Sequence, residues 1–249
     1  MTAPTVLLLP GLLEDAEVFH ACTLGLADIA TTRVVDLTQA ATVADLARQA
    51  HEQAPPGPLH LAGHSMGGYV ALEIVRQAPA RVAGLALLNT HARPDSPEAT
   101  ANRRRLLALA DHDFKSVIET LLPKLMTAAH VKDPALAGIV DTMALGVGKE
   151  AFVRQQEAII HRPDSRPTLA TIRVPTLVVA GREDQLMPLE WLTELAAGIP
   201  GARLEVIDGC GHLSPIEKPR EVIALLRRWL TGRDHPMPEF TIEAPPPAS

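Results

Sequence analysis

The sequence is poor in aromatic residues and has almost no cysteine. Only 3% of its 249 residues are Phe, Trp or Tyr, so Leu, Val and Ala must build both the core and any pocket. This scarcity argues against an aromatic-lined site for sugars or quaternary ammonium groups. The two cysteines, Cys22 and Cys210, are too few for a disulfide framework. We expect both to be small buried residues and the protein to be cytoplasmic.

An excess of positive charge and long hydrophobic runs are also missing. The formal net charge is −6, which argues against nucleic acid as a partner. The densest basic run, Arg103, Arg104 and Arg105, is interpreted as a solvated helix face. No stretch approaches the ~18 uninterrupted apolar residues of a membrane-spanning helix, so we expect no membrane partner. The N-terminus lacks the basic region of a signal peptide.

Six short apolar segments predict β-strands. Most of them are continuously apolar, which is typical of parallel strands covered on both faces. Helical patterns separate the strands, and the first of these begins at a possible Thr42 cap. The alternation predicts an α/β fold with a doubly wound, mostly parallel sheet, which binds ligands beyond the carboxyl ends of its strands. The predicted strands are residues 5–9, 33–37, 59–62, 84–88, 176–180 and 203–207, and the clearest helices are residues 42–54, 189–198 and 220–230.

The pattern changes between the fourth and fifth predicted strands. Residues 94–165 contain about four helical segments and no strand signal. We interpret them as a helical lid inserted into a core formed by residues 1–93 and 166–231. The apolar stripes of the lid are built from Leu, Ile, Val, Met and Ala, which predicts a dry, aliphatic pocket. Residues 232–249 carry five prolines and little periodicity, and we expect a poorly ordered tail without a catalytic role.

The hexapeptide Gly63-His64-Ser65-Met66-Gly67-Gly68 carries the strongest chemical signal. It stands between a predicted strand and a predicted helix, as a Gly-x-Ser-x-Gly nucleophile elbow does. Such a turn is so tight that a Cβ at either flanking glycine would collide with neighbouring backbone. We therefore expect Ser65 to be a nucleophile at the carboxyl edge of the sheet. Its neighbour His64 is expected to pack or to hydrogen-bond locally.

A serine nucleophile needs a base, and the base needs an orienting acid. Asp184 follows the fifth predicted strand and His212 follows the sixth. The two are 28 positions apart, enough for one helix and one strand, so both are expected beside the elbow. Glu183 is the alternative acid. No group of His, Cys, Asp or Glu has the spacing of a metal site, and no glycine-rich cofactor loop follows a strand, so no metal or cofactor is implied.

These residues resemble those of the α/β-hydrolase superfamily, in its compact, helical-lidded branch of serine carboxylesterases and thioesterases. The resemblance covers roughly residues 3–231 and includes the chain order Ser65, Asp184, His212. It implies that Ser65 is the nucleophile, Asp184 the triad acid and His212 the general base. It also implies an oxyanion hole made by the backbone N–H groups of Leu12 and Met66. Many relatives have histidine where this chain has Pro10, but only the Leu12 amide is needed.

The resemblance leads us to expect a serine hydrolase that cleaves carboxylic esters of small to medium apolar substrates through an acyl-enzyme. Two alternatives remain open. The basic run at residues 103–105 could bind a carboxylate, a coenzyme A phosphate or an acidic carrier protein, as a thioesterase or a carrier-linked methyl ester esterase would need. Some proteins of this fold are instead small-molecule receptors. Leu213 stands where the hydroxynitrile lyases have lysine, which disfavours a lyase, and the sequence predicts no oligomeric state.

Overall fold

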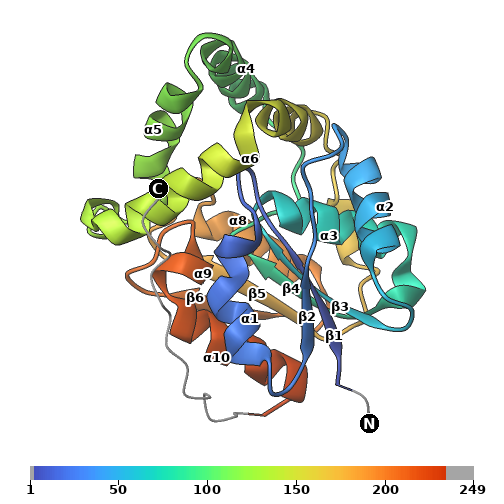
Figure 1. Ribbon diagram of the computed structural model, residues 1–249. Helices are drawn as coiled ribbons and strands as arrows, with labels where there is room; N and C mark the ends of the chain where they lie inside the picture. The colour runs from blue at the N-terminus through green and yellow to red at the C-terminus, as the bar shows by residue number, and fades with distance from the viewer. Residues whose placement is uncertain (1–2, 234–249) are drawn as a thin grey trace.

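The computed structural model describes residues 3–233 and contains one six-stranded sheet (Figure 1). The strand order is β2-β1-β3-β4-β5-β6, and every neighbouring pair is parallel. The predicted doubly wound α/β fold is therefore confirmed. The strands are β1 (Thr5–Leu9), β2 (Thr31–Val34), β3 (Leu59–His64), β4 (Val82–Leu88), β5 (Thr176–Gly181) and β6 (Arg203–Ile207).

The strand predictions are accurate except at β2. β1 and β6 have the predicted bounds, and β3, β4 and β5 extend the predicted segments by one or two residues. β2 begins and ends earlier than predicted, because only Thr31–Val34 pair with β1. It is an edge strand whose side chains are half exposed, so it lacks an apolar run of its own. Val35 and Leu37, which suggested the later bounds, are buried just beyond the strand.

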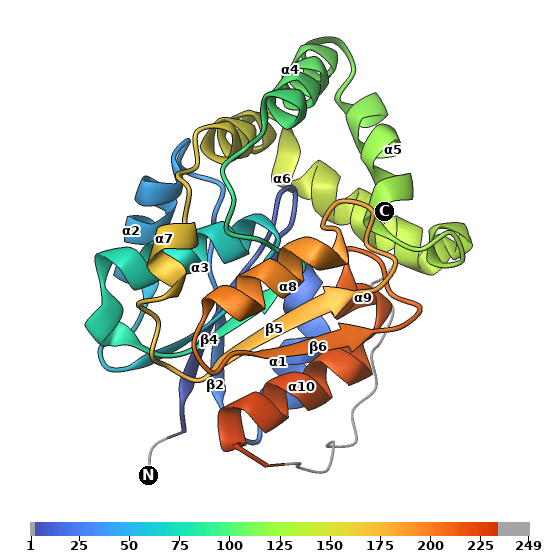
Figure 2. The same ribbon diagram turned by 180° about the vertical axis from the view of Figure 1, so that it is seen from behind.

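Helices cover both faces of the sheet, as Figures 1 and 2 show from opposite sides. Alternate side chains of β1 point to opposite faces, so Leu7 and Leu9 join one core and Val6 and Leu8 the other. The first core includes α2 (Val43–Gln53), α3 (Met66–Gln77) and α8 (Leu189–Gly198). The second includes α1 (His20–Leu26) and α10 (Pro219–Thr231). The short elements are η1 (Ala16–Phe19), η2 (Pro79–Arg81), α7 (Arg166–Leu169) and α9 (Ser214–Glu217).

A helical insertion separates β4 from β5 and stands at one end of the molecule (Figures 1 and 2). It consists of α4 (Pro97–His112), α5 (Phe114–Leu125), η3 (His130–Lys132) and α6 (Pro134–Ile160). α6 is interrupted at Gly148, whose φ of 81° and ψ of 169° are open to glycine and costly for other residues. A small core of its own, with Ile118 and Phe152, joins the insertion to Leu13.

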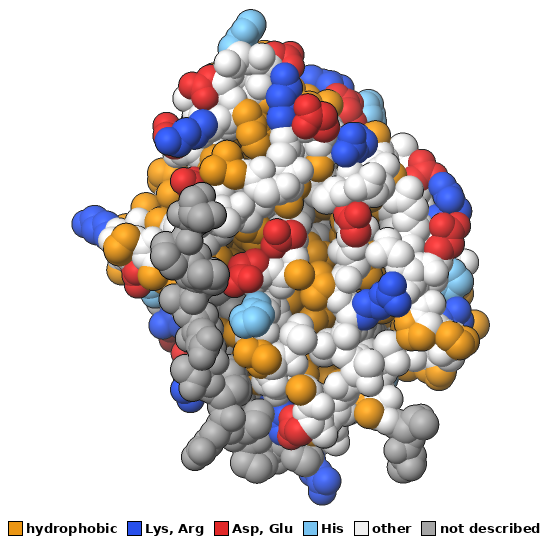
Figure 3. Space-filling view, in the orientation of Figure 1, with side chains coloured by type: hydrophobic (Ala, Val, Ile, Leu, Met, Phe, Trp, Pro, Cys, Tyr) orange, Lys and Arg blue, Asp and Glu red, His pale blue; other side chains and the backbone are white. Residues whose placement is uncertain are grey.

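The charged surface and the two cysteines agree with the composition. On the face shown in Figure 3, Lys and Arg side chains are interspersed with Asp and Glu, and hydrophobic side chains gather beneath the insertion. Cys22 and Cys210 are free and buried as predicted, and burial raises the pKa of Cys22 to about 12. Among residues 3–233 no helix is long and apolar enough to cross a membrane. The predicted tail lies outside the described residues, apart from Gly232 and Arg233.

Candidate active site

Ser65 occupies a strained turn between β3 and α3. Its φ of 51° and ψ of −116° are outside the regions that residues other than glycine normally adopt. A Cβ on Gly67 would stand 1.9 Å from the carbonyl oxygen of Leu9, and one on Gly63 would stand 2.4 Å from that of Gly67. The steric argument for the two glycines is thus confirmed. The surrounding backbone holds the strained residue, because the Ser65 N–H donates to the Leu88 carbonyl at 2.9 Å.

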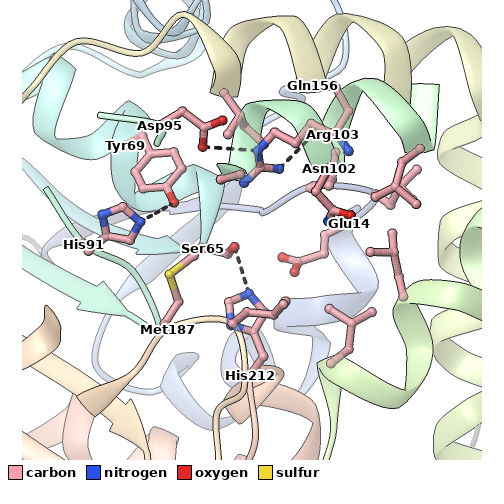
Figure 4. Close-up of a pocket in the computed structure, with 18 of the residues that line it drawn as sticks. Glu14, Ser65, Tyr69, His91, Asp95, Asn102, Arg103, Gln156, Met187 and His212 are labelled. Carbon is pink, nitrogen blue, oxygen red and sulfur yellow. Dashed lines mark hydrogen bonds and ion pairs between the residues drawn. The ribbon is translucent and has the colours of Figure 1, made fainter. Parts of the chain in front are cut away.

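The three side chains predicted to form the triad lie in one hydrogen-bonded chain, of which Figure 4 shows the contact between Ser65 and His212. The Ser65 Oγ is 2.9 Å from Nε2 of His212. The Nδ1 of the same ring is 2.8 Å from Oδ2 of Asp184. The alternative acid, Glu183, accepts a hydrogen bond from the Cys210 amide, while Asp184 holds the imidazole. Residues from three strand ends thus meet at one edge of the sheet.

The Asp184 carboxylate is fully hydrogen-bonded inside the protein. Oδ1 accepts from the backbone N–H groups of Leu186 and Met187, and Oδ2 accepts from Nδ2 of Asn89 at 2.9 Å as well as from His212. Burial alone would raise the pKa of Asp184, but the charge and hydrogen bond of His212, with the other donors, hold it below its usual value. Asn89 was not predicted, although a polar residue directly after the fourth strand is a signal that could have found it.

In the loop that follows β1, hydrogen bonds pair the amides on both sides of Leu12 but leave the Leu12 amide itself unpaired. Glu14 accepts a hydrogen bond from the Gly11 N–H, and Gln155 of α6 accepts one from the N–H of Leu13, whose φ is 60°. The amide of Leu12 lies between them and donates to no described group. Met66, the first residue of α3, likewise has no acceptor for its N–H among residues 3–233. Two unpaired amides are what an oxyanion hole requires, and that role stays a prediction.

A buried ion pair lies beside the reacting groups. Oε2 of Glu14 is 2.9 Å from Nδ1 of His64, and Nε2 of that ring is 2.8 Å from the backbone oxygen of His212. Both ring nitrogens face acceptors, so both donate and the ring is an imidazolium. Burial alone would lower the pKa of His64, but the Glu14 carboxylate and the His212 carbonyl raise it overall. His64 packs inside the protein as expected, but its hydrogen bonds are not local in the sequence, because the partners are 50 and 148 positions away.

The loop that carries His212 is anchored to the helical insertion. The backbone oxygen of Leu125, at the end of α5, accepts from the N–H groups of both His212 and Leu213 at 3.0 Å. Glu217 accepts from the Gly211 N–H at 2.9 Å and from the Thr127 N–H at 2.8 Å. The position of the imidazole therefore depends on the insertion as well as on the sheet.

Ser65 and His212 open into a cavity of about 320 Å³ beneath the insertion. One side of this cavity is aliphatic, but the other carries Tyr69, Arg103 and Gln156 (Figure 4), so the prediction of an aliphatic pocket is correct for one side only. Among residues 3–233, no three His, Cys, Asp or Glu side chains converge as a metal site would require. The aliphatic side is formed by Ile118, Leu121, Leu125, Val140, Met143 and Ala144.

The basic run at residues 103–105 divides between the surface and the cavity. Arg104 and Arg105 are exposed, as predicted, and Arg104 pairs with Glu157. Arg103 departs from the prediction, because its side chain turns inward and is only 21% exposed. Its Nη1 donates to Oε1 of Gln156 at 2.9 Å, and its Nε donates to Asp95 at 3.3 Å.

Comparisons with known proteins identify the family of this chain. The Alpha/beta hydrolase family profile matches residues 6–225. A thermophilic esterase from Thermogutta terrifontis, solved with malate bound, superposes with a TM-score of 0.85 at 31% identity, over 93% of this chain and 90% of that one. A putative carbamate hydrolase from Variovorax paradoxus is 30% identical over 68% of this chain and 66% of its own length. The acetyltransferase component of an acetoin-cleaving system from Cupriavidus necator is 32% identical over 70% of this chain and 46% of its own.

The fold and the family match agree with each other. The chain belongs to the α/β-hydrolase family. It spans about half to two thirds of the length of the curated relatives it matches. Because the names of these relatives cover different substrates, the substrate has to be argued from the cavity itself.

Proposed function

We propose that this protein is a serine hydrolase that cleaves carboxylic esters of small to medium size through an acyl-enzyme on Ser65. The observation that carries the proposal is the chain of hydrogen bonds from Ser65 to His212 and from His212 to Asp184, at 2.9 and 2.8 Å, at the mouth of the cavity. A hydroxyl, an imidazole and a carboxylate in this order form the arrangement that turns serine into a nucleophile.

In the first half of the reaction the Ser65 Oγ attacks the ester carbonyl while Nε2 of His212 takes its proton. Asp184 accepts from Nδ1–H, which keeps the lone pair on Nε2 and stabilises the imidazolium as it forms. The oxyanion of the tetrahedral intermediate receives hydrogen bonds from the amides of Leu12 and Met66. Each amide contributes a few kcal/mol, on the scale of the ~2.7–4 kcal/mol measured for removing one such donor.

The alcohol then departs with the proton from His212, and the acyl group stays on Ser65. Water repeats the sequence, giving its proton to Nε2 and releasing the carboxylic acid. Asp184 must remain ionised throughout, and its lowered pKa supports this role. The mostly aliphatic wall of the cavity suits the hydrocarbon part of an ester, and about 320 Å³ is near the lower end of ligand sites. We also propose that the helical insertion is the lid that keeps bulk water from the acyl-enzyme.

Turnover of p-nitrophenyl esters from acetate to dodecanoate tests the proposal. We expect activity that peaks at short or medium acyl chains and disappears in Ser65→Ala. Ser116→Ala, which changes a serine of α5 outside the cavity, serves as the matched control and should retain wild-type turnover. A folded wild-type protein that hydrolyses none of these esters would contradict the proposal and would favour a carrier-bound thioester substrate or a receptor.

A further inference from the structure

The Tyr69 hydroxyl has a hydrogen that no described group accepts. The Arg93 N–H donates to Nδ1 of His91 at 3.0 Å, so Nδ1 carries no hydrogen. Burial, together with neighbouring arginines, lowers the pKa of His91 to about 3, so the ring is neutral and its hydrogen is on Nε2. Nε2 is 3.2 Å from the Tyr69 Oη and must be the donor in that contact. The hydroxyl is therefore free to donate, and Tyr69 and His91 both line the cavity.

Two further donors on the same side of the cavity lack acceptors. Gln156 is completely buried, and its Nε2 has no hydrogen-bond partner among the described residues. Its Oε1 is engaged by Nη1 of Arg103, which fixes the orientation of the amide. The Nη2 of Arg103 donates to no described group, because the hydrogen bonds of this guanidinium to the described residues use Nε and Nη1 alone. An unpaired buried amide lowers the free energy of unfolding by about 1–3 kcal/mol. A ligand atom that accepts a hydrogen bond from Nε2 of Gln156 would remove this cost.

This side of the cavity is also electropositive. Arg103 and Arg162 share the single carboxylate of Asp95, at 3.3 and 2.7 Å, which leaves one positive charge in excess. The guanidinium of Arg162 stacks 4.5 Å from the centre of the Tyr69 ring and keeps that ring in place. The other carboxylate that lines the cavity, Glu14, is matched by the His64 imidazolium.

Figure 4 shows Tyr69, Arg103 and Gln156 on one side of the pocket and Ser65 with His212 on the other. Tyr69 comes from α3, the helix that begins directly after Ser65. Arg103 and Gln156 come from α4 and α6 of the insertion. We call Tyr69, Arg103 and Gln156 the donor cluster. The rest of the wall is largely aliphatic, so the donor cluster is where a polar group of a bound ester finds hydrogen bonds.

We propose that the donor cluster binds a carboxylate carried by the substrate, so that the preferred substrates are half-esters or similar esters with a free carboxylate a few bonds from the scissile carbonyl. This inference rests on the proposed ester hydrolysis at Ser65. A carboxylate accepts several hydrogen bonds at once, and a guanidinium with a neighbouring amide and hydroxyl supplies donors in matching directions. The excess positive charge favours an anion over a neutral acceptor such as a second ester group.

The test compares two substrates that differ in charge, monomethyl glutarate and dimethyl glutarate, at pH 7. We expect wild-type kcat/KM to be at least tenfold higher for the half-ester, the scale of one charge-assisted hydrogen bond, with the difference mainly in KM. The ratio of the two kcat/KM values, written as half-ester over diester, is the readout. It should fall about tenfold or more in Arg103→Gln and also in Gln156→Glu, which keeps the side-chain shape but adds a negative charge.

Arg104→Gln is the matched control, because Arg104 is the next residue on α4 and pairs with Glu157 away from the donor cluster. It should keep the wild-type ratio. Gln156→Glu keeps an oxygen for Arg103 to bind, so it gives a folded protein even where Arg103→Gln is unstable. A wild-type enzyme that hydrolyses esters without preferring the half-ester, or variants that keep the ratio, would overturn the inference alone. A wild-type protein that hydrolyses no ester would overturn the proposed function first.

Discussion

Replacing Glu14 by glutamine removes one charge from the buried pair without changing the shape of the side chain. In the wild type, the Glu14 carboxylate accepts from the Gly11 N–H and from the His64 ring, whose second nitrogen donates to the His212 carbonyl. Glutamine leaves His64 with two unfavourable choices. It either stays charged in a buried place without a counter-charge, or it becomes neutral. A neutral ring can donate to the His212 carbonyl and accept from the NH2 group of the glutamine, but that NH2 group then faces the Gly11 N–H, which loses its acceptor.

The structure sets the size of the effect. The side chains of His64 and Glu14 are 0% and 4% exposed, so solvent cannot replace the lost interaction. Breaking a buried pair by changing one partner costs about 3 kcal/mol or more. For a protein of this size, that lowers the melting temperature by roughly 6–12 °C. Because the same pair supports Gly11 beside the proposed oxyanion hole and the backbone of His212, we also expect kcat to fall about tenfold.

The pH dependence has a definite sign. The pKa of His64 is raised in the folded protein, so its charge stabilises the fold fully below the unfolded pKa of about 6.5, and this contribution is lost as pH rises through the folded pKa. The stability gap between wild type and Glu14→Gln should therefore narrow at alkaline pH.

Urea unfolding from pH 6 to pH 10, with ester turnover at each pH, measures both effects. Glu17→Gln is the control, because no described group hydrogen-bonds to that side chain. The reasoning is refuted if Glu14→Gln lowers the unfolding free energy by less than about 1 kcal/mol at pH 7 and if its difference from the wild type does not change with pH.

Three other substitutions test separate parts of the site. Asn89→Ala removes a donor from Asp184 and should lower kcat about tenfold and the unfolding free energy by about 2 kcal/mol in urea titration. Gly67→Ala puts a Cβ 1.9 Å from a backbone oxygen and should lower the unfolding free energy by more than about 4 kcal/mol in thermal unfolding. Gly138→Ala, whose Cβ has no atom within 4 Å, should instead raise the unfolding free energy by up to about 1 kcal/mol. His91 is neutral when folded, with a pKa of about 3, so the wild type should lose about 2 kcal/mol more than His91→Asn between pH 7 and pH 5.

Each of these has a contrary outcome. Wild-type turnover in Asn89→Ala would mean that the Asp184 carboxylate needs no support from that amide. Equal stability of the two glycine variants would contradict the steric account of the turn at Ser65. Parallel stability curves of wild type and His91→Asn would mean that folding does not lower the pKa of His91, which removes one of the two supports for the tautomer that leaves the Tyr69 hydroxyl free to donate.

The parts of the molecule that depend on neighbouring residues in the sequence were predictable. Continuous apolar runs predicted the central strands, because parallel strands are covered on both faces. The two glycines around Ser65 predicted the turn, because only glycine fits there. Asp184 and His212 were predicted to meet Ser65 because the carboxyl ends of parallel strands lie at one edge. Their hydrogen bonds now confirm that proximity, while their catalytic roles stay a prediction.

The supporting residues were not predictable from local patterns. Glu14 and His64 are 50 positions apart, Asn89 and Asp184 are 95, and Leu13 and Gln155 are 142. Such contacts depend on the relative placement of whole elements, which no short motif encodes.

The direction of Arg103 could have been predicted. It lies three positions before Leu106 and seven before Ala110, and residues at this spacing share one face of a helix. Both of those side chains are buried, so the same face turns Arg103 toward the cavity. The three consecutive arginines instead led us to predict that all of residues 103–105 are exposed to solvent.

Covalent labelling with an alkyl fluorophosphonate tests the central claim most directly, because the reagent phosphonylates an activated serine. Intact mass and peptide mapping should show one adduct per chain, on the peptide that contains Ser65. The adduct should be prevented by an ester substrate and absent from Ser65→Ala, whose turnover should be below about a thousandth of wild type. An adduct on another residue, or a Ser65→Ala variant that still hydrolyses esters above that level, would contradict the assignment of Ser65 as the nucleophile.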